Sequence, residues 1–294
     1  MPTTDAAPLH EPVLRWYAAH ARDLPWRHPG CTPWGVLVSE VMAQQTPVAR
    51  IVPPWEAWMT RWPTPASLAA DTPAAAIRMW DRLGYPRRAV NLHRTALALV
   101  RHHGGEVPSD EPSLRSLPGV GAYTAAAVAA FAFGRRTTVV DTNVRRVLVR
   151  ALLGAAQAAP SLNAAERALA LASTPLDGPT SVAWNVALME VGALVCTART
   201  PRCGQCPITE ECAWFGAGRP AYDGPPRRGQ RYEGTDRQVR GGILEALRQS
   251  REPLPRKAFD GLDEDPGRLD RCLAGLVEDG LVEPRGRIGY ALPG

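Results

Sequence analysis

Lysine is almost absent from this chain of 294 residues. Lys257 is the only lysine among its 34 lysine and arginine residues, so arginine carries nearly all of the positive charge. Primary amines are the groups that form an imine with a sugar aldehyde. Imine chemistry on a sugar is therefore restricted to Lys257 and the amino terminus.

Long apolar runs are missing as well. Hydrophobic residues make up 45% of the chain, yet no run approaches the ~20 residues of a membrane-spanning helix. Residues 1–10 contain an aspartate and no apolar centre, which predicts that they are not a secretory signal. We therefore expect a cytoplasmic protein. The net charge of +5 favours a polyanionic partner, although a merely basic surface explains it equally well.

Strand-like alternation is nearly absent too, with residues 137–140 as its one short candidate. The chain up to about residue 216 consists instead of segments rich in Ala, Leu, Val and Arg, separated by Pro and Gly. This pattern predicts an all-α domain of many short helices. The expected helices are 9–21, 34–45, 74–83, 90–102, 123–133, 144–153, 164–172 and 182–195.

The composition changes after this helical part. Residues 217–234 are rich in Gly, Pro and Arg and hold few apolar residues, which is typical of a linker. Residues 235–294 predict two helices and then a hairpin, the outline of a small winged-helix-like module. Its expected elements are 239–248, 269–279 and 281–292, with the hairpin turn at Arg285-Gly286.

Four of the six cysteines are crowded into one short segment. Four thiolates hold either a tetrahedral zinc ion or an iron–sulfur cluster, and zinc sites more often use two tight pairs joined by a longer arm. Without a secretion signal, clustered thiols favour a metal over disulfides. The clustered residues are Cys196, Cys203, Cys206 and Cys212, and the isolated Cys31 and Cys272 are expected to be buried or half-buried thiols.

A glycine-rich turn opens one of the expected helices. Residues 117–125 read Leu-Pro-Gly-Val-Gly-Ala-Tyr-Thr-Ala. Small residues let a backbone come close to a ligand, and amide N–H groups at the start of a helix bind phosphate. We therefore expect Gly119 and Gly121 to contact a phosphate backbone. Tyr123, in the first turn of the helix, is expected either to pack inside or to border the ligand.

Two carboxyl groups occupy positions that suit chemistry. Asp141 follows an apolar run and precedes an expected helix, so it is an N-cap or a catalytic group, and the two roles are compatible. Glu40 lies in the apolar helix 34–45 and is either a half-exposed surface acid or a proton donor. Apolar surroundings raise the pKa of an acid and keep a proton on it.

Several motifs resemble one known family. The hairpin, with Asp141 about twenty residues downstream, resembles the DNA glycosylase superfamily that carries a helix-hairpin-helix, and the cysteine order resembles the [4Fe–4S] loop of endonuclease III and MutY. Residues 39–46, Ser-Glu-Val-Met-Ala-Gln-Gln-Thr, resemble the signature of adenine DNA glycosylases of the MutY type. Further segments resemble that family in the same order: 22–27, 83–92 and 189–196.

The resemblance covers about residues 9–216 and implies a fold and a cofactor. It implies a six-helix barrel domain at 29–135 that contains the helix-hairpin-helix. It also implies an iron–sulfur helical domain built from 1–28 and 136–216, with a [4Fe–4S] cluster held by the four clustered cysteines. The implied partner is double-stranded DNA with an A·8-oxoguanine or A·G mispair, bound by a monomer in the bacterial cytoplasm near the nucleoid.

The resemblance also implies roles for individual residues. Glu40 protonates adenine, Asp141 stabilises the sugar cation, and Asn143 supports Asp141. A lysine at the position of Tyr123 makes a bifunctional enzyme, so the tyrosine implies a monofunctional glycosylase in base excision repair. The remaining roles are an adenine pocket lined by Arg27 and Glu190, a wedge formed by Gln45, contacts of Thr46 and Leu83 with the opposite purine, and a second DNA-facing loop that holds Tyr85.

The chain departs from that family at three places. Tyr85-Pro86 stands where two tyrosines are usual, and Thr142 replaces a frequent glycine. About sixty residues of a different pattern occupy the place of a β-rich, Nudix-like domain. Two alternative functions stay open: a thymine or uracil mismatch glycosylase, and a non-catalytic iron–sulfur DNA-binding regulator.

Overall fold

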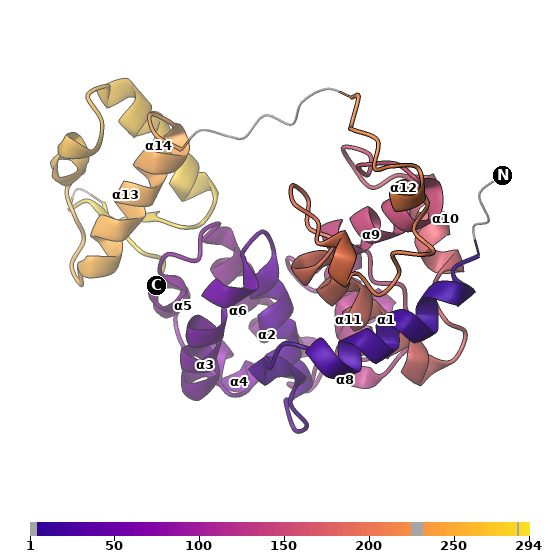
Figure 1. Cartoon of the computed structure of the whole chain (residues 1–294). Coiled ribbons are helices and arrows are strands. Elements are labelled where there is room, and N and C mark those ends of the chain that lie inside the picture. Colours follow the sequence, from indigo (N-terminus) through magenta and orange to yellow (C-terminus); the bar gives the residue numbers. More distant parts are fainter. Residues whose placement is uncertain (1–4, 225–231, 287) are drawn as a thin grey trace. The chain divides into compact units, whose positions relative to one another are not determined.

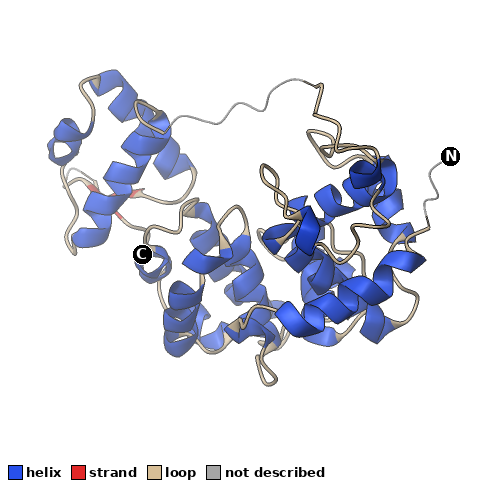
Figure 2. Cartoon of the chain, viewed as in Figure 1, coloured by secondary structure: helices blue, strands red, loops and turns tan. Residues whose placement is uncertain are grey.

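Helices make up nearly all of the regular structure (Figures 1 and 2). The structure is a computed structural model that describes residues 5–224, 232–286 and 288–294. The α-helices are α1 (Ala7–His20), α2 (Pro33–Ala43), α3 (Val52–Arg61), α4 (Pro65–Ala69), α5 (Pro73–Trp80), α6 (Arg87–His102), α7 (Glu111–Ser116), α8 (Ala122–Phe133), α9 (Thr142–Leu153), α10 (Ala164–Ala172), α11 (Gly178–Leu194), α12 (Ala213–Gly216), α13 (Asp236–Gln249) and α14 (Pro266–Glu278).

Short 3-10 helices and one hairpin complete the described elements. The 3-10 helices are η1 (Pro25–Arg27), η2 (Val48–Arg50), η3 (Cys203–Gln205) and η4 (Arg256–Leu262). Strands β1 (Glu283–Pro284) and β2 (Tyr290–Ala291) pair antiparallel, with Glu283 opposite Ala291. The all-α character predicted from the sequence is confirmed, and the tail holds the two helices and the hairpin that its pattern predicts.

Some elements were not predicted. Helices α3, α4, α7 and α12 are absent from the expected set, because α3 and α4 begin at proline-rich positions and the other two are short. Conversely, residues 137–140 form no strand. The amide of Val139 donates to the side chain of Asn185 at 3.1 Å, so a side chain replaces the sheet partner at this position.

The described residues divide into two compact units. The first comprises residues 5–36, 109–115 and 120–224, and its core lies among α1, α9, α10 and α11. Trp184 and Val191 of α11 are buried there against Val144 and Leu148 of α9. Asp177 caps α11 and Asp141 caps α9, which fixes where both helices begin.

The second unit comprises residues 37–108, 116–119, 232–286 and 288–294. Three fully buried tryptophans centre its helical part, with Trp58 edge-on to both Trp62 and Trp80 at ring-centroid distances of 4.6 and 5.7 Å. Edge-to-face pairs of this kind add about 0.5–1.5 kcal/mol beyond their burial. The expected boundaries at 28/29 and 135/136 stay predictions, and residues 225–231 of the expected linker lie outside the described residues.

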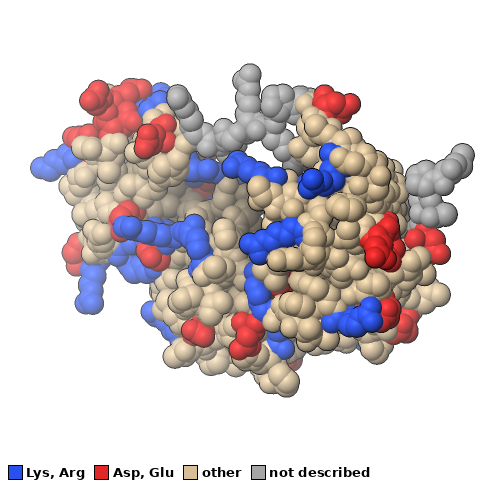
Figure 3. All heavy atoms as spheres, in the orientation of Figure 1, with Lys and Arg blue, Asp and Glu red and all other residues tan. Residues whose placement is uncertain are grey.

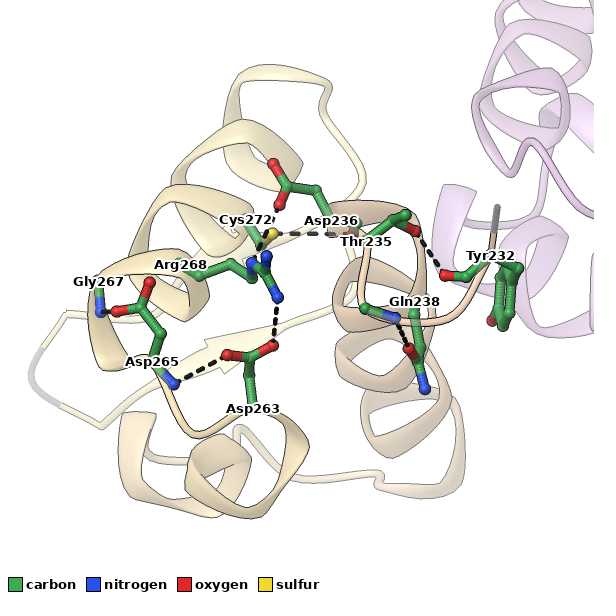
Figure 4. Close-up of polar contacts among 10 residues, drawn as sticks. Tyr232, Thr235, Asp236, Gln238, Asp263, Asp265, Gly267, Arg268 and Cys272 are labelled. Atoms are coloured by element: carbon green, nitrogen blue, oxygen red, sulfur yellow. Dashed lines mark hydrogen bonds and ion pairs between the residues drawn. The ribbon is translucent and has the colours of Figure 1, made fainter. Parts of the chain in front are cut away.

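The tail, residues 232–294, has its own apolar centre and belongs to the second unit. Phe259 is fully buried, as are Ile243 of α13 and Leu276 of α14. Figure 4 shows Arg268 reaching from α14 to two carboxylates, with 3.1 Å to Asp263 and 3.5 Å to Asp236. These contacts connect α14 with α13 and with the end of η4, around the buried apolar centre.

No helix among the described residues has the length and apolar character that crossing a membrane requires.

Candidate active site

Asp141 is fixed at the N-terminus of α9. Its Oδ1 accepts a hydrogen bond from the Val144 amide at 2.7 Å, and its Oδ2 accepts one from the Asn143 side chain at 2.7 Å. Burial raises the pKa of Asp141 above its ordinary value, and the hydrogen bonds from Val144 and Asn143 offset part of this effect. The N-cap predicted from the sequence is present, and the carboxylate is held in one orientation.

Asn143 is in turn held by Arg146 and packs closely against Gly192. Nη2 of Arg146 donates to Asn143 Oδ1 at 2.8 Å and to the Gly192 carbonyl at 2.6 Å. A Cβ at Gly192 would lie 2.6 Å from Cβ of Asn143, so α11 approaches α9 this closely only because residue 192 is glycine. Nε of Arg146 also donates to the carbonyl of Cys196, which connects this site to the cysteine loop.

Glu190 lies in a buried ion-pair network in the first unit. Its carboxylate is fully buried and accepts hydrogen bonds from Arg22 at 2.6 to 3.1 Å and from Arg27 at 2.8 Å. Burial alone would raise the pKa of Glu190, but the hydrogen bonds from Arg22 and the charge of Arg27 hold it below its ordinary value. Nη1 of Arg27 is buried without a hydrogen bond among the described residues, which leaves a donor available for a ligand.

Glu40 occupies a buried helix in the second unit. Residues 34–42 of α2 are all buried, and Glu40 itself is only 7% exposed. The surface position that the sequence left open is therefore excluded. Full burial of an acid on an apolar helix is rare in stable folds without a functional reason.

Arg88 organises the backbone that follows Glu40. This buried guanidinium donates to the carbonyls of Val41 and Met42, at 3.0 and 2.9 Å, where α2 ends. A cation at the C-terminus of a helix also complements the helix dipole. Burial lowers the pKa of Arg88 to about 10, so it remains a cation at neutral pH.

The same arginine brings together residues that the sequence assigned to the opposite base. Nη2 of Arg88 donates to the Thr46 hydroxyl at 2.9 Å and to the Leu83 carbonyl at 3.2 Å, and both residues are buried. Gln45 and Tyr85 on either side of this centre are exposed and have positive φ angles of 56° and 48°. Left-handed backbone at non-glycine residues persists only where the surroundings hold it, and it is frequent at functional sites.

The glycine-rich turn has the geometry that its sequence predicts. Gly119 has a φ of +76°, and a Cβ there would lie 2.8 Å from Cβ of Asn91. The Thr95 hydroxyl donates to the Pro118 carbonyl at 2.7 Å and anchors the turn. Gly121 is exposed and caps α8, so the amides of the first turn of α8 are not blocked by a side chain at the cap. Tyr123 is half-buried and packs beside Ala126 and Ala127.

The four clustered thiols lie in one loop of the first unit. All are half-buried and none forms a disulfide. Cys206 interacts electrostatically with Cys196 and Cys212, so the thiols are close in space. Among the described residues no three His, Cys, Asp or Glu side chains lie close enough to bind one metal ion, which does not bear on a cluster whose thiolates bind separate irons.

The donor set of this loop fits an iron–sulfur cluster. It offers four thiol sulfur atoms within one short segment. Nη1 of Arg150 lies 3.4 Å from Sγ of Cys196 and its Nη2 donates to the carbonyl of Ala198, so one cation orders the loop and faces a cysteine sulfur. Its guanidinium stacks on Trp214 at 4.4 Å.

Two family models match the chain. Residues 38–171 match the HhH-GPD superfamily base excision DNA repair protein, and residues 196–212 match the iron–sulfur binding domain of endonuclease III. The adenine DNA glycosylase of Mycobacterium tuberculosis is 51% identical over 96% of this chain and 92% of its own length. The adenine DNA glycosylase of Mycolicibacterium smegmatis is 50% identical over 96% of this chain and 95% of its own length.

The chain belongs to the adenine DNA glycosylase family. Since 96% of the chain is aligned, most of the tail lies within this similarity. A solved structure of a thermostable thymine-DNA glycosylase superposes with a TM-score of 0.65 at 27% identity, over 72% of this chain and 97% of that one. The helix-hairpin-helix fold, the DNA substrate and the [4Fe–4S] cofactor predicted from the sequence are confirmed.

Three arginines that support this glycosylase site were not predicted. Arg22, Arg88 and Arg146 each hold a residue that the sequence assigned to the site, namely Glu190, Thr46 and Asn143. In this arginine-rich chain no single arginine stands out from the sequence. For Arg22 and Arg88 the available signal was their position inside segments 22–27 and 83–92, which resemble the family, whereas Arg146 lies outside both segments.

Proposed function

We propose that this chain is a monofunctional glycosylase that hydrolyses the N-glycosidic bond of adenine mispaired with 8-oxoguanine or guanine. The observation that carries the proposal is the buried Glu40 in the segment that resembles the adenine-specific signature. The mycobacterial relatives named adenine DNA glycosylase, similar over nearly the whole chain, support it.

Glu40 supplies the proton for the leaving base. Adenine leaves readily only after protonation, here at N7, and a general acid contributes typically 10²- to 10⁴-fold to such a step. The buried position of Glu40 on α2 suits an acid that must hold its proton until the base is bound. Gln45 fills the base stack while adenine is flipped out, and Arg27 and Glu190 line the pocket that receives it.

Asp141 stabilises the sugar cation. Cleavage leaves positive charge on the sugar, and a carboxylate fixed beside it lowers the free energy of that state. The hydrogen bonds from Val144 and Asn143 keep Asp141 in place while it performs this role. Water then completes the hydrolysis and leaves an abasic site.

Other residues bind the duplex. The amides around Gly119 and Gly121 bind flanking phosphates, together with arginine side chains. Thr46, Leu83 and Tyr85 contact the purine opposite adenine. Tyr123 borders the sugar and forms no imine, so the chain leaves an intact DNA strand.

The cluster has a structural role in this proposal. A [4Fe–4S] cluster is held by Cys196, Cys203, Cys206 and Cys212. When bound, it cross-links and stiffens the loop and takes no part in the hydrolysis. Arg199 and Arg202 of the same loop contact DNA phosphates. The enzyme acts as a monomer in the bacterial cytoplasm, where its substrate, the nucleoid DNA, is located.

Base release from defined duplexes tests this proposal. We expect free adenine from A·8-oxoguanine and A·G duplexes and an abasic strand that stays intact until treated with base. Thymine or uracil freed from a G·T or G·U pair, with adenine untouched, would instead favour the mismatch glycosylase, whose scaffold is similar. Normal DNA binding without release of any base would favour the non-catalytic regulator.

A further inference from the structure

Tyr85 lies at the tip of a loop that is rigid inside and exposed outside. The ring is 45% exposed, and its φ of 48° follows a φ of 80° at Gly84. Arg88 and Trp80 both donate to the Gly84 carbonyl at 2.9 Å. The backbone of the loop is therefore fixed by side chains of α5 and α6, while these contacts leave the outer side of the ring unrestrained.

The tail supplies that missing restraint. Arg237, in the first turn of α13, donates from Nη2 to the Tyr85 hydroxyl at 2.6 Å, and its guanidinium carbon lies 5.1 Å from the ring centroid. The guanidinium carbon of Arg88 lies 5.7 Å from the same centroid. A hydrogen bond and a cation–π contact from one arginine together restrict both the position and the rotation of the ring.

The loop also has ion pairs with the tail on both sides of Tyr85. Arg82 lies 3.4 Å from Glu245 of α13, and Arg87 lies 2.8 Å from Asp279 at the end of α14. Both arginine side chains are largely exposed, so these pairs contribute little energy by themselves. They fix the position of the tail instead, because they connect it to the loop at residues 82 and 87 and so bring Arg237 next to Tyr85.

The loop and its neighbours carry arginines and exposed tyrosines, and two of these arginines pair with carboxylates of the tail. Arg50 donates to the carbonyl of Arg82 at 2.8 Å, and Tyr232 at the start of the tail is 54% exposed. Figure 3 shows both Lys and Arg and Asp and Glu side chains on the left-hand part of the view that holds the tail. A surface of arginines and exposed tyrosines suits contact with phosphates and base faces.

We propose that Arg237 is a positioning residue through which the tail holds the Tyr85 ring against DNA and so takes part in selecting the base opposite adenine. This inference rests on the proposed function. A ring that is already ordered costs less conformational entropy when the duplex binds. Because the ring is placed before binding, its fit to the opposite base depends on α13.

A double-mutant cycle on the full-length chain tests this role without catalysis. Binding is measured to duplexes that carry an uncleavable abasic analogue opposite 8-oxoguanine or guanine. We expect Arg237→Ala to weaken binding about 5- to 10-fold, the range that a hydrogen bond plus a cation–π contact provides. In a Tyr85→Ala background the same substitution should change binding less than about 2-fold, because the group it positions is gone.

A charge-retaining variant separates positioning from a direct phosphate contact. Arg237→Lys keeps the charge but loses the planar fork, so we expect it to behave like Arg237→Ala. The ratio of binding to the 8-oxoguanine and guanine duplexes should change in both variants. It should not change in Arg251→Ala, an exposed arginine of the same tail, which is the matched control.

Three results would overturn the inference. They are an equal loss from Arg237→Ala in both backgrounds, wild-type affinity of Arg237→Lys, and an unchanged ratio between the two duplexes. These results differ from a failure of the proposed function. If the wild-type chain released no adenine, the proposed function would fail, while the binding cycle would still report whether Arg237 and Tyr85 act together.

Discussion

Asp141 is an acid whose environment favours its neutral form. Burial raises its pKa above 3.8, and the bonds from Val144 and Asn143 only partly offset this. For the folding equilibrium, the free energy of unfolding falls as the pH rises from 3.8 to the raised value, since the folded chain binds this proton more tightly. At neutral pH the buried, ionised Asp141 therefore lowers the free energy of unfolding, a cost that its role at the sugar cation explains.

The raised pKa predicts where activity is lost in acid. Asp141 must be ionised to stabilise the sugar cation, so we expect the single-turnover rate of adenine release to fall at a pH above 3.8 as Asp141 takes up its proton. Asp141→Asn should lose roughly 10²- to 10³-fold at neutral pH and should show no such dependence. A wild-type rate that stays constant down to pH 3.8 would contradict this role.

Glu190 predicts a large effect on stability. Glu190→Ala leaves Arg22 and Arg27 without their buried carboxylate, and we expect the free energy of unfolding to fall by roughly 3 kcal/mol in denaturant titration. Since the pKa of Glu190 is lowered, its contribution is present above pH 4.5 and is lost as the pH falls through the lower folded value.

An exposed acid of the same unit serves as the control for Glu190. Glu11→Ala removes a carboxylate whose side chain is 75% exposed and lies 3.2 Å from Arg15. We expect a change within about 0.5 kcal/mol, because exposed pairs contribute little. If Glu190→Ala lowered the free energy of unfolding no more than Glu11→Ala does, the Glu190 network would not stabilise the first unit.

At the scale of elements, the contact of α9 with α11 positions the site. A Cβ at Gly192 would meet Asn143 at 2.6 Å, so Gly192→Ala must push the two helices apart. We expect a loss of about 1–3 kcal/mol in stability and a slower release of adenine, because the added Cβ displaces the Asn143 side chain that donates to Asp141. Thermal unfolding and single-turnover rates check both effects.

The matched control is a helical glycine with free space around it. A Cβ at Gly216, the last residue of α12, would meet no atom within 4 Å. Gly216→Ala should therefore keep the wild-type rate. A wild-type rate in Gly192→Ala would show that the separation of these helices does not position Asn143.

The sequence predicted the long helices because their apolar period and their caps are local signals. Asp141 and Asp177 precede α9 and α11 as N-caps, and both helices form as expected. It missed α3, whose first turn contains two prolines, because proline is read as a break although it suits the first helical positions. The contacts of Arg88 could not be predicted. Five of its six acceptors are backbone carbonyls, which carry no sequence signal, and the sixth is the Thr46 hydroxyl, far from Arg88 in the sequence.

At the scale of the whole molecule, the cysteine loop and the tail are additions around a helical framework. The loop 196–212 reaches the core of the first unit through Ile208, which is 1% exposed. Removing the cluster should therefore loosen that core as well as the loop. The motifs name candidate residues for each site, and their roles stay predictions, whereas the contact of the tail with the loop at 82–87 could not be predicted, because no motif records it.

Iron removal tests this dependence. We expect chelation of iron to lower the thermal unfolding temperature and to weaken DNA binding, since the thiols and Arg150 lose the group that orders them. Cys31→Ser, which changes a thiol outside the loop, should keep the cluster absorption and the unfolding temperature. An apo form as stable as the holo form would contradict a structural role for the cluster.

The most direct test compares wild type with Glu40→Gln on an A·8-oxoguanine duplex under single-turnover conditions. We predict that wild type releases free adenine, and that Glu40→Gln binds the duplex normally but releases adenine at least about 100-fold more slowly. Glu56→Gln, an exposed acid on α3, should match wild type. Adenine release by Glu40→Gln at the wild-type rate would contradict the assignment of Glu40 as the acid that makes this chain an adenine glycosylase.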